Sequence, residues 1–315
     1  MTTDTAAAES TTFTAREVPW MKIGRITEGA LTAREAIAAG GLDFTVDLRP
    51  AGYRGLDHAW HEIPGRLAVV RDDTGAPFDF VSESYRPLQY ADAFEFMDAV
   101  HPRYVAAGAL RGGRQGFLVV KPDGLVDVSP GGDVVEMFVV LRTSHDRSQA
   151  VEVSVMPLRD KCMNQLTLRS FTRGVADRWA IAHTTTMAAK LEQVHNTLAQ
   201  LDRYTAAFNA LAERLMERRI VVAQAEAIAA DAMRGFASPA VREAGAAEIV
   251  RLWRDDTERV GFNGTGWAIV NATSEFLEWR RRGRADNVEA RFNAAVDGLT
   301  HRAINRATER VLALG

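Results

Sequence analysis

Two apolar runs separated by a polar turn constrain the fold of this 315-residue chain more than any other feature. Met137 to Leu141 is apolar, residues 143–148 (TSHDRS) are polar, and Ala150 to Met156 is apolar again around Glu152. Apolar runs that flank a polar turn are typical of a β-hairpin. Because Pro157 follows, we expect the second strand to end there and a basic helix to begin after it.

Further strand patterns extend this hairpin into an antiparallel meander. Short turns rich in glycine and proline separate the predicted strands, which are Val105–Leu110, Phe117–Lys121, Val134–Arg142 and Ala150–Met156. A last short strand is predicted at Trp179–Ala182. Upstream, we predict a helix capped by Thr32 and Glu35, a strand at Phe44–Leu48, a hairpin joining Leu67–Arg71 to Phe78–Ser82, and a helix at Tyr90–Val100.

The pattern becomes helical after residue 184. From Met187 onward, apolar residues recur with helical spacing, which predicts a long amphipathic helix with a break near Tyr204. Further helices are predicted at Val221–Met233, Pro239–Trp253, Trp267–Trp279 and Asn287–Leu314. We therefore predict an α+β fold in which an antiparallel β-meander packs with helices and an all-α C-terminal region follows. The predicted units are a disordered tail at 1–12, an α+β core domain at 13–184 and a helical domain at 185–315.

Composition excludes several classes of protein. An apolar fraction of 47% with 25% charged residues is that of an ordinary globular protein. The net charge of -3 gives no overall attraction to nucleic acid, so any such binding requires a local basic patch. One cysteine, Cys162, forms no internal disulfide and is typical of a reducing cytoplasm, and we expect it to be buried and inert. No stretch has the length and apolarity of a membrane span, so no membrane partner is expected.

The sequence offers little for catalysis or for cofactor binding. His145 and Asp146 could act as a general base and its orienting carboxylate, but Ser144 lies on a hairpin turn and not on a nucleophile elbow. Alternatively, Asp146 and Ser148 close the turn. His58 and His61 lack a third metal ligand, and the paired glycines match no phosphate-binding fingerprint. We therefore predict no catalytic residue, no metal and no cofactor.

Basic residues give a clearer indication. They gather around the hairpin and just after it, an arrangement that suits a phosphate backbone, although a solvated surface is the alternative. The predicted nucleic-acid-binding residues are Arg111, Arg114, Lys121, Arg142, His145, Arg147, Arg159, Lys161, Asn164, Arg169 and Arg173. A second basic cluster, Arg280–Arg284, ends a predicted helix and complements its dipole. Near the N-terminus, Trp20 and Ile23 are the predicted oligomer contacts, unless they pack on their own domain.

Several motifs together resemble the phage/plasmid-like protein family, a domain of unknown function found in phages, prophages and plasmids. They are F-x-x-R-x-x-P-W (Phe13, Arg16, Pro19, Trp20), R-x-D-T-G (Arg71–Gly75), Thr143-Ser144-His145-Asp146, Arg159 with Cys162 and Asn164, His183-Thr184, and Asn271 with Glu275. The chain departs from the family pattern at Met21, Arg147 and Gln165. Departures at these positions would disturb catalysis more than binding, so they favour a binding surface.

This family is remotely similar to phage single-strand annealing proteins. The similarity implies a protein that binds single-stranded DNA in a basic groove and anneals complementary strands without ATP. It also implies a homo-oligomer, as a ring or a filament, in the cytoplasm of a bacterial host. A phage exonuclease and a host single-strand-binding protein are candidate partners. Two alternatives stay open: a non-enzymatic structural or regulatory phage protein that binds a partner through its helical half, and an enzyme that uses His145 and Asp146.

Overall fold

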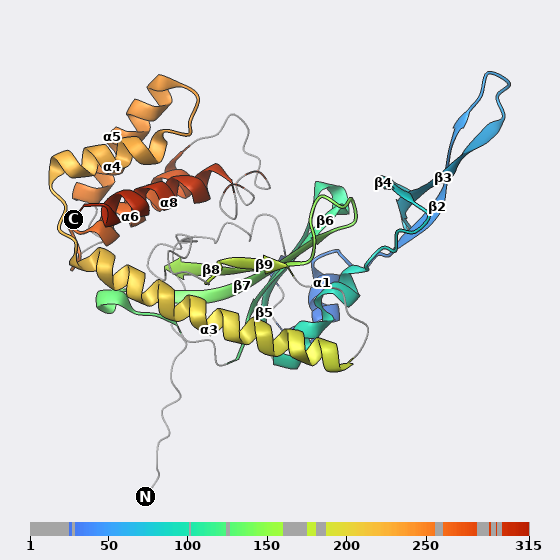
Figure 1. Cartoon of the computed structure of the whole chain (residues 1–315), viewed down its shortest axis with the longest axis horizontal. Coiled ribbons are helices and arrows are strands. Elements are labelled where there is room, and N and C mark those ends of the chain that lie inside the picture. The colour runs from blue at the N-terminus through green and yellow to red at the C-terminus, as the bar shows by residue number, and fades with distance from the viewer. Residues whose placement is uncertain are drawn as a thin grey trace, which may run out of the picture.

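The computed structural model describes residues 25–26, 29–100, 102–123, 127–159, 175–180, 187–255, 261–281, 290, 294 and 298–314. Within them, two antiparallel sheets form the first half of the chain, and helices follow in the second half (Figure 1). This arrangement confirms the predicted α+β class with a helical C-terminal region.

The larger sheet is the predicted meander. Its strands are β1 (Arg25–Ile26), β5 (Arg103–Leu110), β6 (Gln115–Lys121), β7 (Val135–Ser144), β8 (Glu152–Arg159) and β9 (Arg178–Ala180), and this is also their order across the sheet. Both faces of the central strands are buried. One face carries Leu118, Val139 and Val153 into the main core, while Phe117 and Val140 belong to a separate cluster on the other face.

Strand β8 does not end at Pro157, so the prediction for this boundary is wrong. The strand continues to Arg159, and Pro157 lies opposite Met137 of β7. Strand β9 pairs with β8 only from Glu152 to Ser154. At position 157, the edge of β8 that faces β9 therefore has no described partner strand, and the missing N–H of proline breaks no hydrogen bond there. Proline is tolerated at such an edge. Arg159 therefore lies at the end of a strand and not on a helix.

The smaller sheet has the order β2–β3–β4, formed by β2 (Val46–Arg54), β3 (Trp60–Arg71) and β4 (Pro77–Ser82). Its inner face contributes Val46, Val69 and Val81 to the core. Beyond β4, the paired residues 52–54 and 60–62 with their connecting turn form a two-stranded ribbon that projects from the body (Figure 1). The sequence predicted only the proximal parts of β2 and β3, because a ribbon exposed on both faces lacks the alternation of a half-buried strand.

The helices cover the core and build the second half. They are α1 (Ala33–Ala39), α2 (Tyr90–Phe94), the 3-10 turns η2 (Glu95–Val100), η3 (Arg111–Gly113) and η4 (Pro130–Gly132), then α3 (Met187–Glu217), α4 (Val222–Met233), α5 (Pro239–Asp255), α6 (Gly266–Glu275), the π-helical η6 (Phe276–Arg280) and α8 (Leu299–Leu312). The Thr32 half of the predicted cap of α1 is confirmed, since Glu35 N–H donates to Thr32 Oγ1 at 3.2 Å. The Glu35 carboxylate accepts from Leu31 N–H at 2.7 Å and not from Thr32 N–H.

Helix α3 spans both halves of the chain. It runs without a break through Tyr204, whose buried ring stacks on Phe208, so the predicted break is wrong. The helix lies along the α+β part (Figure 1), where it contacts η2 and η4, and it also contacts α6 and α8. One cluster of buried apolar residues runs through both predicted domains.

A buried carboxylate connects the larger sheet to the helical half. Arg159 Nε donates to both Asp133 oxygens at 2.7 and 2.8 Å, and Trp267 Nε1 of α6 donates to Asp133 Oδ2 at 2.8 Å. All three residues are 0% exposed. The Arg159 guanidinium also lies 5.0 Å from the centre of the Phe262 ring. Because Arg159 and Asp133 are buried, removing either charge would leave the other one buried without a partner, which is strongly destabilising.

Replacing Asp133 tests this connection. Asp133→Asn keeps the shape but leaves the buried Arg159 charge uncompensated, so the free energy of unfolding should fall by about 3–5 kcal/mol. The measurement is urea denaturation of both proteins. Glu248→Gln is the matched control, because it breaks the partly exposed Glu248–Arg251 pair and should cost at most about 1 kcal/mol. A change for Asp133→Asn no larger than that of the control would contradict the role of this carboxylate.

Candidate nucleic-acid interface

The structure brings four of the predicted residues together at one end of the larger sheet. Arg111 and Arg114 lie in the β5–β6 connection, and His145 and Arg147 lie in the β7–β8 turn. The two connections are joined by a hydrogen bond from His145 N–H to the Arg114 carbonyl at 2.8 Å. The other predictions, namely Trp20, Ile23, Lys161, Cys162, Asn164, Arg169 and Arg173, lie outside the described residues.

The remaining predicted cations lie elsewhere and are paired with carboxylates. Lys121 Nζ is 2.8 Å from Asp127 and 3.5 Å from Glu136, and Arg142 donates to Glu152 across the β7–β8 ladder at 2.6 Å. Arg142 is 3% exposed and Arg159 is 0% exposed, so neither guanidinium can meet a phosphate in solvent. The described residues therefore do not form the single basic face that we expected from Arg111 to Arg159.

His145 is fully buried in an aromatic box. Its ring lies 4.1 Å from Tyr90, 6.1 Å from Phe44 and 6.2 Å from Phe78, measured between ring centroids. Neither ring nitrogen has a hydrogen-bond partner among the described residues. Burial lowers the His145 pKa to about 4, and the nearby Asp146 charge opposes this shift only in part. A buried, neutral imidazole does not bind phosphate, and its packing joins the two sheets.

Asp146 closes the turn, as the alternative interpretation predicted. Its carboxylate accepts from Ser148 N–H at 3.0 Å and also from the Ser148 hydroxyl. No hydrogen bond joins Asp146 to the His145 ring. The described geometry therefore lacks the imidazole–carboxylate contact on which a general base would depend.

The buried His145 predicts a loss of stability in mild acid. The folded state binds the His145 proton only near pH 4, whereas an unfolded histidine binds it near pH 6.5, so unfolding is favoured as the pH falls between these values. We expect the free energy of unfolding to drop by about 2 kcal/mol between pH 7 and pH 5. His145→Phe should lack this contribution, while exposed His58→Gln should retain it. Equal pH profiles for wild type and His145→Phe would show that His145 is not held neutral.

The outer face of the smaller sheet presents an exposed aromatic ring on its edge strand β4 and two arginines on β2 and β3. Strand pairing aligns Arg49, Ala68 and Phe80, and it places Arg66 opposite Ser82. Because side chains alternate along a strand, Arg49, Arg66 and Phe80 share the face opposite to the buried Val69. Phe80 is 58% exposed. We call Arg49, Arg66 and Phe80 the outer face.

No carboxylate among the described residues pairs with the cations of the outer face. Arg49 and Arg66 are exposed, and neither forms an ion pair with another residue in the described part of the chain. Two predicted residues reach the adjoining strand β4. Arg114 donates to the Pro77 carbonyl at 3.3 Å, and Arg147 donates to Asp79 at 2.6 Å and to the Phe80 carbonyl at 3.3 Å. Such a surface can stack a flat base on the ring and attract phosphates to the guanidinium groups.

The sequence alone did not predict the outer face, because the outer face is defined by which side chains of the smaller sheet are exposed to solvent. Phe80 lies between Asp79 and the buried Val81. The sequence indicated a half-buried strand here, but it did not indicate that Phe80 is the apolar residue that faces solvent. A better indication was the segment 49–66, RPAGYRGLDHAWHEIPGR, in which arginines and aromatic residues flank a Gly-Leu-Asp-His turn.

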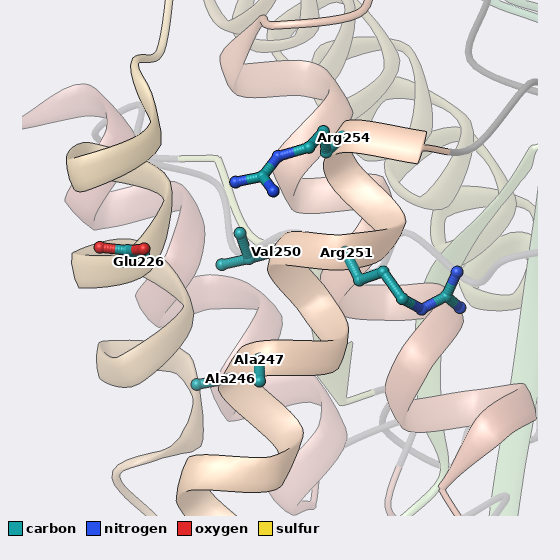
Figure 2. Close-up of a pocket in the computed structure, with 6 residues that line it drawn as sticks. All are labelled: Glu226, Ala246, Ala247, Val250, Arg251 and Arg254. Carbon is teal, nitrogen blue, oxygen red and sulfur yellow. The ribbon is translucent and has the colours of Figure 1, made fainter.

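Two cavities lie elsewhere in the described structure. One, of about 410 Å³, lies between α4 and α5 and is lined by Glu226, Ala246, Ala247, Val250, Arg251 and Arg254. In Figure 2, Arg254 extends past Val250 toward α4, whereas Arg251 points to the other side of α5. The other, of about 420 Å³, lies against α3 and has an acidic lining that includes Asp127, Asp202 and Glu213. No group of described residues could hold a metal ion.

Comparison with known proteins identifies a family but no activity. A family model described as a domain of unknown function, DUF932, matches residues 77–301, which is more than half of the chain. No curated protein and no solved structure matches the chain. The match begins at β4, so β2 and β3 precede it. Among the described helices, none is long and apolar enough to cross a membrane.

Proposed function

We propose that this chain, which belongs to the DUF932 family, binds single-stranded DNA and anneals complementary strands without ATP. The observation that carries the proposal is the outer face, where Phe80 on the edge strand β4 is exposed and shares its face with Arg66 on β3 and Arg49 on β2. Aromatic rings with nearby cations on an open sheet bind single strands with little dependence on sequence, because every base has a flat face.

The chemistry of the outer face is compatible with annealing. Guanidinium groups hold phosphates, and a ring contacts the flat face of a base. Neither contact occupies the Watson–Crick edges, so a complementary strand can still pair with the bound one. The net charge of -3 gives the whole chain no overall attraction to DNA, so binding depends on the local patch.

The resemblance to phage annealing proteins supports further parts of the proposal. They are an origin in a phage or prophage, action in the cytoplasm of a bacterial host, and assembly into a ring or filament through Trp20 and Ile23. Lys161, Arg169 and Arg173, which lie outside the described residues, stay candidate phosphate contacts in addition to those of the outer face. A phage exonuclease or a host single-strand-binding protein would act with the annealing protein.

A second candidate function rests on the α4–α5 cavity. Its apolar part at Ala246 and Val250 lies beside Arg254, whereas Arg251 points to the other side of α5 (Figure 2). A cation next to an apolar surface suits an acidic segment of a protein partner, although Glu226 also lines this cavity. A structural or regulatory phage protein that binds a partner through its helical half would use such a surface. Binding of single-stranded DNA distinguishes the two candidates.

Charge removal on the outer face tests the leading proposal. Arg49→Gln with Arg66→Gln should weaken binding to every sequence alike, because phosphate contacts carry no sequence information. Each lost contact lowers the salt slope of single-strand binding by about 0.7, so the double variant should lower it by about 1.4. The measurement is the affinity for a labelled oligonucleotide across a salt series, with circular dichroism to verify folding.

The matched control changes net charge equally at a distance. Arg214 of α3 and Arg310 of α8 are exposed, and replacing both with glutamine should leave the salt slope unchanged. An equal effect of the two double variants would show that only total charge matters. If the outer-face variant binds like wild type, Arg169 and Arg173 become the next pair to replace. Absence of single-strand binding by wild type at low salt would overturn the proposal, and binding without accelerated pairing of complementary oligonucleotides would remove annealing from it.

A further inference from the structure

The tip of the ribbon holds the Trp60 indole close to the backbone of Gly52. A Cβ atom on Gly52 would lie 2.4 Å from Cζ2 and 2.5 Å from Cε2 of Trp60, distances that real Cβ atoms essentially never show. The indole ring therefore occupies the space that a side chain at position 52 would need. Trp60 is nevertheless 57% exposed. Part of the ring thus lies against the ribbon while much of its surface stays open to solvent.

A cation lies beside this ring on the same face of the ribbon. Arg54 pairs directly opposite Trp60, so the two side chains share a face. Arg54 is exposed and forms no ion pair with any residue that the structure describes. Glu62, opposite Gly52, is the acidic residue of this face. We call Trp60, Gly52 and Arg54 the Trp60 platform.

The other face of the ribbon carries a second ring. Tyr53 pairs opposite His61, and their rings stack with centroids 5.5 Å apart and planes 29° from parallel. Asp57 fixes the His61 ring, with His61 Nε2 lying 3.1 Å from each carboxylate oxygen. Tyr53 is 58% exposed. Because Tyr53 and Trp60 occupy opposite faces, the tip does not offer one contiguous apolar patch of the kind that docks a protein partner.

We propose that the Trp60 platform is a stacking site for an unpaired nucleobase, with Arg54 contacting a neighbouring phosphate. This inference rests on the proposed single-strand binding and extends it from the outer face to the ribbon tip. The Trp60 ring can stack on the flat face of one base, and the Arg54 cation beside it can contact the negative phosphate of the same nucleotide or its neighbour. Arg49 and Arg54 lie on the same strand, separated by roughly 17 Å at the usual rise per residue. A register shift between Pro50 and Gly52 separates the two positions, so the tip is a contact distinct from the outer face.

Substitutions at the tip separate stacking from other roles. Trp60→Ala should weaken binding to an oligothymidine by about 10- to 100-fold, because base stacking on an aromatic side chain contributes that much. Trp60→Phe should retain most of the affinity. The salt slope should stay unchanged in both, since no charge is lost, which distinguishes this site from the arginines of the outer face. Affinity for a duplex of equal length should not change, because its bases are already stacked.

Two further variants test the geometry of the platform. Gly52→Ala keeps Trp60 but places a Cβ 2.4 Å from its indole and 2.5 Å from the His61 carbonyl oxygen, so it should weaken single-strand binding by moving the ring and the strand beside it. Leu56→Ala is the control for apolar surface, because Leu56 lies in the turn at the tip, is fully exposed and has no aromatic face. It should bind like wild type. Glu62→Gln should strengthen binding, because it removes a negative charge beside the platform.

Each outcome decides between this inference and the function on which it rests. If wild type binds single strands and Trp60→Ala binds equally well, the stacking site is overturned while the proposed function stands. If Trp60→Ala and Leu56→Ala both reduce the mass in sedimentation and leave DNA affinity unchanged, the tip is a contact between protein subunits, which also overturns stacking. If wild type does not bind single strands at all, both proposals are overturned. Circular dichroism of each variant verifies that the exposed substitutions leave the fold intact.

Discussion

The Asp133 carboxylate is the interaction on which the arrangement of the two halves depends. It lies just before β7, accepts from Arg159 at the end of β8, and accepts from Trp267 in the first turn of α6. A buried arginine without its carboxylate would be strongly unfavourable, so the sheet and α6 have to meet at this point. Because Asp133 has to contact both Arg159 and Trp267, the helical half is held at one end of the larger sheet.

The opposite end of the larger sheet positions the candidate interface. There the buried His145 packs against Phe44 and Phe78, which belong to the smaller sheet and its approach. Arg147 adds a hydrogen-bonded ion pair to Asp79 of β4. These contacts hold the smaller sheet on the body, while its strands and the ribbon extend away from the C-terminal helices (Figure 1). The surface we assign to DNA is therefore supported by a rigid base.

Pairing distinguishes the structural cations from those available for binding. Lys121, Arg142 and Arg159 each contact a carboxylate, whereas Arg49, Arg54 and Arg66 have no ion pair among the described residues. Much of the proposed interface also precedes the part of the chain that the family model matches, since β2 and β3 end before residue 77. The family description names no activity, so the proposal rests on the chemistry of this surface.

The sequence by itself determined the local elements. Alternation and turn residues predicted the meander, the Thr32–Glu35 pattern predicted the cap of α1, and the Asp146–Ser148 spacing predicted the closed turn, because each depends on contacts within a few residues. Only the tertiary structure decided that Arg159 is paired, that His145 is buried and that Trp60 is exposed. These properties depend on distant residues: Asp133 and Trp267 are 134 positions apart, and no local pattern reports which side chains such contacts remove from solvent.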